Sequence, residues 1–139
     1  MAFLGMPAGQ QEVKADDFIL WADRYIRLPG KEQISGLEFY GARCAMLHTY
    51  GTASKISRQG RVRQIGYMNR AVPEVIPSQD QPDVLVLVSI AALRDSLFAG
   101  IDRYLVDLFA DKNRASVAES RLNLLVTAFN YRPSSEVAS

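Results

Sequence analysis

The chain has 139 residues, of which 48% are apolar and 22% are charged, and its formal net charge is +1. This composition is that of an ordinary globular domain, so the chain is not expected to be disordered. It also gives no sign of a protein that binds nucleic acid or an acidic partner through an extreme overall charge. A single cysteine and a single histidine exclude an internal disulfide and a multi-histidine metal site. No glycine-rich phosphate loop is present, and we expect neither a metal nor a cofactor.

The sequence lacks the properties of a membrane span and of a secretory signal. The apolar stretch over residues 84–93 is about half the length that crosses a bilayer. Residues 1–11 lack the charged start and the long apolar run of a secretory signal. We therefore expect a soluble, cytoplasmic protein that does not bind a membrane.

Composition divides the chain into one domain and two tails. Residues 1–14 and 132–139 contain glycine, glutamine, proline or serine without a hydrophobic period, so we expect both to be flexible. Residues 15–131 hold four helical patterns and two extended segments. The sequence thus predicts a single, mainly α domain, a four-helix bundle-like arrangement with a small two-stranded antiparallel β element.

Two helices are predicted in the first half of the chain. The first begins at residue 16 or 17 and ends before Pro29, because aspartates satisfy the free amides at a helix start and proline ends a helix. Its buried stripe has helical spacing and consists of Phe18, Trp21, Ala22 and Tyr25. The second helix runs from residue 35 or 36 to Tyr50, and Gly51 is suited to end it.

The extended segments lie in the middle of the chain. Residues 61–68 alternate imperfectly between polar and apolar side chains, and residues 84–88 are an unbroken run of valine and leucine. Residues 52–60 and 69–83 are predicted loops. We expect the two strands to form an antiparallel ribbon that packs against the helices, since an isolated ribbon is only marginally stable in water.

Two further helices are predicted after the strands. Ser89 is expected to cap the third, whose apolar face comprises Ile90, Leu93, Leu97, Ile101, Tyr104, Leu105 and Leu108. The capping-box pattern from Ser116 to Glu119 predicts the start of the fourth helix. The buried stripe of that helix comprises Ala118, Leu122, Leu125, Val126 and Phe129.

Positive charge is concentrated in one segment. Residues 39–73 contain no acidic residue and have a charge of +6, whereas the rest of the chain, with ten basic and fifteen acidic groups, has −5. The basic groups of the segment are Arg43, Lys55, Arg58, Arg61, Arg63 and Arg70. This segment attracts a polyanion, or alternatively it is a solvated basic loop that complements acidic helices of the same chain.

The predicted second helix ends on the pattern R-x4-H-x-Y, formed by Arg43, His48 and Tyr50. His48 titrates near neutral pH and can act as a general acid or base in metal-free RNA cleavage. The Arg43 guanidinium can hold phosphate oxygens as charge develops on them, and Tyr50 can position a phosphate or a base beside it. Because His48 lies about 140° from Arg43 around the helix, a compact site is easiest to assemble between two copies related by a two-fold axis.

At these residues the chain resembles the HEPN superfamily, a group of helical proteins that includes metal-independent RNases acting as dimers. The diagnostic motif of the superfamily is R-x4-6-H, and some toxin members have R-x4-H-x-Y. The resemblance covers eight of the 139 residues. It implies that Arg43 and His48 are the catalytic pair and that Tyr50 assists them. The chain departs from the family pattern at Cys44, where a polar residue is usual, and in the position of the motif on the second helix.

Three hypotheses follow for the function. The leading one is a HEPN-like homodimer that binds or cleaves RNA or a nucleotide, with phosphate contacts from Lys55, Arg58, Arg61 and Arg63. The alternative is a non-catalytic helical interaction module, in which Arg43 and His48 only fix an interface with a second copy or with another protein. A small-molecule sensor with an apolar pocket between helices is the third, and no residue pattern favours it.

Overall fold

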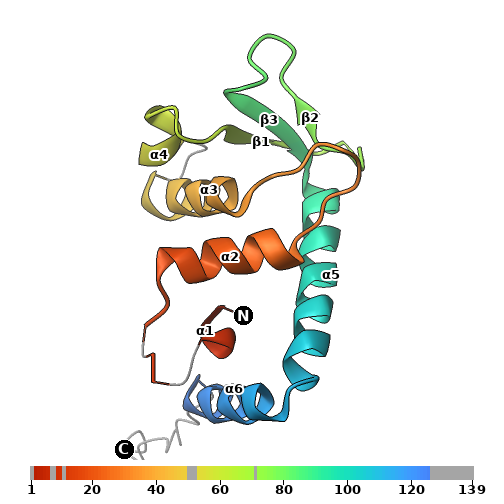
Figure 1. Cartoon of the computed structure of the whole chain (residues 1–139). Coiled ribbons are helices and arrows are strands. Elements are labelled where there is room, and N and C mark those ends of the chain that lie inside the picture. The colour runs from red at the N-terminus through yellow and green to blue at the C-terminus, as the bar shows by residue number, and fades with distance from the viewer. Residues whose placement is uncertain (1, 7–8, 11, 50–52, 71, 126–139) are drawn as a thin grey trace, which may run out of the picture.

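A computed structural model describes residues 2–6, 9–10, 12–49, 53–70 and 72–125. Over these residues the protein is mainly helical, with a small mixed sheet at one end (Figure 1). The longest element is α5 (Ile90–Phe109), which runs from the sheet to α6 (Lys112–Leu125) at the opposite end. The mainly helical fold class is therefore confirmed, as is the presence of a small β element.

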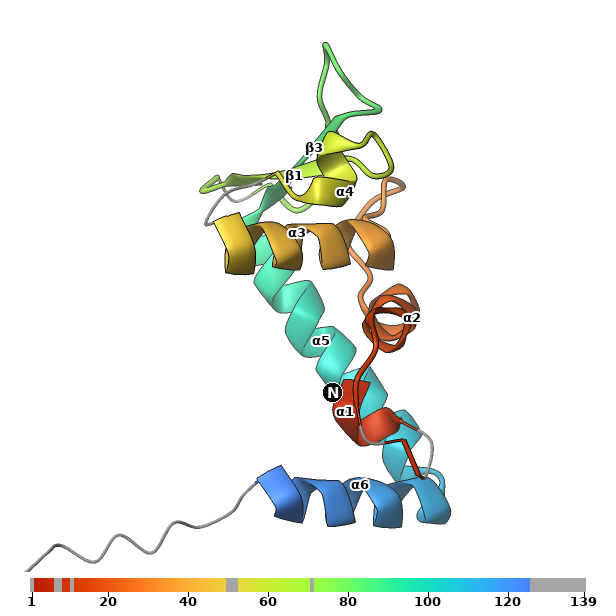
Figure 2. The ribbon, with the colours of Figure 1, turned by 90° about the vertical axis from the view of Figure 1, so that its left-hand side faces the viewer.

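The other helices lie across α5. In chain order they are α1 (Ala2–Gly5), α2 (Ala15–Tyr25), α3 (Gly36–Thr49) and α4 (Lys55–Arg58). From the sheet downward, α3, α2, α1 and α6 follow one another along α5, and α2 packs directly on α3 (Figures 1 and 2). A four-helix bundle is not confirmed, because α2, α3 and α6 cross α5 instead of aligning with it.

The sheet has three strands in the order β1-β3-β2, which are β1 (Gln64–Met68), β2 (Ile76–Pro77) and β3 (Leu85–Ser89). β1 pairs with β3 in parallel, from Gln64 opposite Leu85 to Met68 opposite Ser89, whereas β2 pairs with β3 antiparallel. The predicted two-stranded antiparallel ribbon is therefore wrong. The connection over residues 69–84 is long enough to return the chain to the start of β1, as a parallel pair requires, and it supplies β2 on the way.

The core lies where α2, α5 and the sheet meet. Trp21, Ala22 and Tyr25 are buried and Phe18 packs partly buried against them, which confirms the predicted stripe of the first helix. Val86 and Val88 on β3 are fully buried. Tyr104 and Leu108 on α5 each have an exposed fraction of 2%. The predicted face of the third helix is confirmed only in part, since the exposed fraction of Ile90 is 54% and that of Leu97 is 38%.

Helix starts follow the local capping groups. The Ser89 hydroxyl accepts a hydrogen bond from the amide of Ala92 at 3.2 Å, so the predicted cap of α5 is confirmed. α6 begins earlier than predicted, because Asp111 Oδ1 accepts from the amides of Asn113 (2.9 Å) and Arg114 (3.2 Å). Ser116 therefore lies inside α6. Val126 and Phe129, predicted for its buried stripe, lie outside the described residues.

Two short helices occur where composition predicted none. α1 lies within the segment assigned to an N-terminal tail, and Met6, which follows it, is 4% exposed. α4 lies within the predicted polar loop, where Ser54 and Ser57 form reciprocal hydrogen bonds that cap the turn. Both helices are single turns that depend on tertiary contacts or caps, so hydrophobic periodicity does not detect them.

α2 meets α5 in a close backbone contact at Gly100. A Cβ atom at this position would lie 2.8 Å from the carbonyl oxygen of Tyr25, at the end of α2. The same carbonyl accepts hydrogen bonds from Arg103 Nε (3.2 Å) and Nη2 (2.6 Å). Because Gly100 has no side chain, the end of α2 approaches α5 closely enough for Arg103, one turn further along α5, to donate to the Tyr25 carbonyl.

We predict that Gly100→Ala destabilises the fold. The added methyl group would overpack the contact by about 1–3 kcal/mol, and the better helix propensity of alanine offsets about 1 kcal/mol of this. Urea unfolding should therefore show a net loss of about 1 kcal/mol, the middle of the remaining range of about 0–2 kcal/mol. Asp102→Ala, at an exposed position of the same helix, should leave the urea midpoint of unfolding unchanged. An equal urea midpoint for the two variants would contradict the prediction that the close contact at Gly100 matters for stability.

Candidate functional site

The motif that carries the functional hypothesis lies on α3. The helix begins with a reciprocal cap, in which the Ser35 hydroxyl accepts from the Glu38 amide at 3.2 Å and the Glu38 carboxylate accepts from the Ser35 amide at 2.7 Å. The predicted start of the second helix is thus confirmed, and Arg43 and His48 occupy one continuous helix. The side chain of His48 and the whole of Tyr50 lie outside the described residues, so the arrangement of the three side chains stays a prediction.

Arg43 lies on an exposed part of α3. Within the described ranges, no carboxylate forms an ion pair with its guanidinium. Met46 and Leu47, three and four residues further along the helix, are its neighbours on this surface, and their exposed fractions are 58% and 57%. A guanidinium without an ion pair among the described residues, next to two exposed apolar side chains, is suited both to an anion and to a second protein surface.

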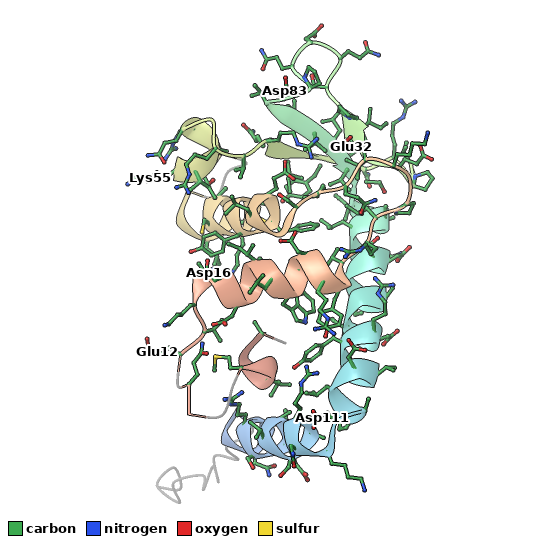
Figure 3. The ribbon with its side chains drawn as sticks, viewed as in Figure 1. Glu12, Asp16, Glu32, Lys55, Asp83 and Asp111 are labelled. Carbon is green, nitrogen blue, oxygen red and sulfur yellow. The ribbon has the colours of Figure 1, made fainter. Side chains whose placement is uncertain are left out.

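α4 packs beside α3 and carries two of the predicted phosphate contacts. A Cβ atom at Gly41 would lie 3.1 Å from Ile56 Cδ1, so the glycine lets the short helix approach closely. Lys55 and Arg58 are exposed on α4, and Lys55 lies at the outer edge of the molecule (Figure 3). Arg61 is exposed just after this turn. The three cations therefore lie on a segment that is anchored to the helix of the motif.

Arg63 has a different environment from the other predicted contacts. Its Nε donates to Glu38 Oε1 at 2.5 Å, its Nη2 donates to the Gln33 carbonyl at 2.9 Å, and its Nη1 pairs with Glu32. Hydrogen bonding to Glu38 raises the pKa of Arg63, and this effect outweighs the opposite effect of burial. We therefore leave Arg63 out of the candidate interface, because its donors join the start of β1 to α3.

Glu38 is the buried partner in this network. Burial alone would raise the pKa of the Glu38 carboxyl, but hydrogen bonds from Arg63 and Ser35 together hold it below its ordinary value. The carboxylate is therefore ionised at neutral pH. It ties the first turn of α3 to the residue that precedes β1, and so it fixes the orientation of α3 relative to the sheet.

Two tyrosines near Arg43 were not predicted for the site. Tyr40 lies one turn before Arg43 on α3, and Tyr67 on β1 places its hydroxyl 3.9 Å from the sulfur of Met46. The hydrogen bond with Cys44 raises the pKa of Tyr40, and burial raises the pKa of Tyr67. Both therefore remain protonated donors at neutral pH. The i, i+3 spacing from Arg43 was a signal for Tyr40, whereas Tyr67 required the tertiary structure.

Other kinds of site find little support in the described part of the chain. Among those residues, no group of three or more histidine, cysteine or acidic side chains is placed to hold a metal ion. No described helix combines the length and the apolar character needed to span a bilayer.

Comparisons with protein-family models, with curated proteins and with solved structures found no match to this chain. The functional argument therefore depends on the residues themselves.

We predict that Glu38→Gln destabilises the protein at neutral pH by about 3 kcal/mol, because it breaks a largely buried ion pair. Since the pKa of Glu38 is lowered on folding, this contribution is present above the ordinary value of 4.5 and disappears as the pH falls through the folded-state pKa. Urea unfolding of both proteins from pH 7 to pH 3 should show a difference that narrows below about pH 4.5. Glu119→Gln, an exposed control on α6, should behave like the original chain at every pH, and equal stability of Glu38→Gln at pH 7 would contradict the prediction.

Proposed function

We propose that this chain is a HEPN-like homodimer that binds RNA and cleaves it without a metal ion. The observation that carries the proposal is the exposed Arg43, which forms no ion pair with any described carboxylate and precedes the chain's single histidine by five residues on one helix. The α4 segment, which carries further exposed cations, packs against that helix. With Arg63 neutralised by acidic partners, the candidate phosphate contacts are Lys55, Arg58 and Arg61.

These residue types can carry out the cleavage of RNA as a transesterification. His48 would take the proton of the 2′-hydroxyl, whose oxygen then attacks the adjacent phosphorus. The bond from phosphorus to the 5′ oxygen breaks, leaving a cyclic phosphate, and the departing oxygen takes a proton from water. Arg43 would donate to the non-bridging oxygens, and this interaction strengthens as charge develops on them.

The proposed dimer places the two groups together. On one copy of α3 the two positions lie about 140° apart around the helix axis, so one phosphate is not easily held by both. The exposed Met46 and Leu47 give the surface around Arg43 the apolar character of a protein contact. A second copy of α3 packed there would bring its His48 to the Arg43 of the first copy.

The non-catalytic interaction module is the second candidate, and α5 provides a specific observation in its favour. Several large apolar side chains of α5 are exposed, namely Ile90, Leu97, Phe98, Val106 and Phe109. Exposed apolar groups on one helix are typical of a surface that binds another protein. In this case the chain would have a protein partner and little affinity for RNA.

We predict that Arg43→Ala and His48→Ala each abolish the metal-free cleavage of a single-stranded RNA, measured in EDTA. Mixing the two inactive variants should restore activity if each site takes one residue from each copy. Random exchange gives half heterodimers with one complete site each, so the expected activity is about one quarter of the original.

Light scattering must show that both variants remain dimers, and Lys112→Ala on α6 serves as an active control. A mixture that stays inactive places the two residues in a site within one chain, which contradicts the shared arrangement. Undiminished cleavage by His48→Ala would contradict the catalytic proposal, and a stable dimer without cleavage or RNA affinity would support the interaction module.

RNA binding should also depend on the cations of the α4 segment. We predict that replacing Lys55, Arg58 and Arg61 by alanine weakens the binding of single-stranded RNA and reduces the log-log salt slope by about 2, at about 0.7 per phosphate contact. Fluorescence anisotropy at several salt concentrations measures both quantities. The matched control replaces Lys31, Arg94 and Lys112, which changes the net charge equally at other exposed positions. An equal effect of both triple variants would show that only overall charge matters.

A further inference from the structure

A pocket is lined by α1 together with residues of α2, α5 and α6. In Figure 1, α1 lies on the opposite side of α2 from α3, the helix of the candidate RNA site. Its two lobes are neighbouring cavities of about 200 Å³ and about 370 Å³, and Gly5, Met6 and Arg114 line both. The smaller lobe is lined by aromatic side chains of α2 and α5, including Trp21 and Tyr104, and the larger lobe is mostly apolar. Helices from both ends of the chain therefore contribute to one concave site.

Two side chains that line the smaller lobe carry a buried hydrogen-bond donor with no partner among the described residues. Trp21 Nε1 and Tyr104 Oη are buried, and neither forms a hydrogen bond with any described atom. The two rings pack edge-on at 6.2 Å, and their exposed fractions are 9% and 2%. Tyr25 in the same aromatic cluster differs, because its hydroxyl donates to Asp107 at 3.1 Å. A buried donor without a partner costs about 1–3 kcal/mol, so two of them on one pocket favour an acceptor that binds there.

The charges around the pocket favour an anion. The guanidinium of Arg114 lines both lobes and pairs with no carboxylate in the described part of the chain. The two other charged groups in the wall already have partners: Arg24 pairs with Asp107, and Asp17 accepts a hydrogen bond from Gln10. Burial raises the pKa of Tyr104, and the charges of Arg114 and Arg121 act in the opposite direction.

The segment that covers the pocket is held in place from α6. A Cβ atom at Gly5 would lie 3.0 Å from Tyr104 Oη, so the backbone of α1 lies close to the unpaired hydroxyl. Arg121, which is 8% exposed, donates to the carbonyl oxygens of Met6 and Leu4. The backbone around α1 is thus held by a buried cation, whereas Arg114, also on α6, forms no ion pair with any described carboxylate.

We propose that this pocket binds a small organic carboxylate. Its oxygens accept hydrogen bonds from Trp21 Nε1 and Tyr104 Oη, and Arg114 balances its charge. The organic part lies in the larger lobe, whose walls include Leu4, Leu108 and Val117. One free cation and an apolar wall suit a monoanion with an apolar body better than a phosphate. This site is separate from the proposed RNA site, and its failure would leave that proposal unaffected.

The single tryptophan of the chain, Trp21, provides a direct measurement. Titration of the full chain with sodium benzoate at constant ionic strength should give a saturable change in tryptophan fluorescence, with the affinity confirmed by calorimetry. We expect Tyr104→Phe and Arg114→Gln each to weaken benzoate binding about tenfold or more. Tyr67→Phe, on β1 and outside the pocket, removes a hydroxyl that lines neither lobe, so this control should bind within about twofold.

Stability gives a second readout that does not depend on the choice of probe. Because the Tyr104 hydroxyl has no partner, Tyr104→Phe without ligand should unfold at the same or a higher urea concentration than the original chain. A clear loss of stability would show that the hydroxyl is already satisfied, and it would overturn the proposal. The absence of saturable benzoate binding, equal binding by Tyr104→Phe, or inorganic phosphate binding as tightly as benzoate would overturn it as well.

Discussion

The position of the candidate RNA site depends on one buried carboxylate. Glu38 accepts from the amide and hydroxyl of Ser35 at the start of α3, and it also binds Arg63 just before β1. A single side chain therefore joins the helix that carries Arg43 to the strand that enters the sheet. Since α4 lies between these two elements in the chain and packs on α3, the network also limits where Lys55 and Arg58 can lie.

The local features of the fold were predictable from the sequence, because they depend on neighbouring residues. The stripe from Phe18 to Tyr25 follows from helical spacing, and the Ser89 cap follows from the residue type before an apolar run. Features that depend on distant residues were not predictable. The pair of Glu38 and Arg63 joins positions 25 residues apart, and no local pattern distinguishes this arginine from Arg61, which is exposed.

The antiparallel ribbon, which was wrong, and the four-helix bundle, which was not confirmed, have a common physical origin. A strand such as β3 shows by its valines that it is buried, but its sequence does not specify the direction of its neighbour. Likewise the apolar face of α5 shows that the helix packs, without specifying the angle at which α2 and α6 cross it. The crossing with α2 is set by Gly100, which admits the carbonyl of Tyr25, and a glycine inside a predicted helix has no single structural meaning.

The arginines of this chain divide by what their guanidinium groups contact. Arg63 donates to carboxylates, and Arg121 donates to backbone carbonyl oxygens, so both guanidinium groups hold parts of the fold together. Arg43 and Arg114 have no carboxylate partner within the described ranges. Arg43 lies beside exposed apolar groups, and Arg114 lines a pocket whose walls include two side chains with unpaired donors. Leaving a guanidinium uncompensated next to buried donors or apolar surface gives no stability to the isolated chain. On the two proposals, a polyanion bound at α3 and a small carboxylate bound in the pocket next to α1 would each stabilise the folded protein.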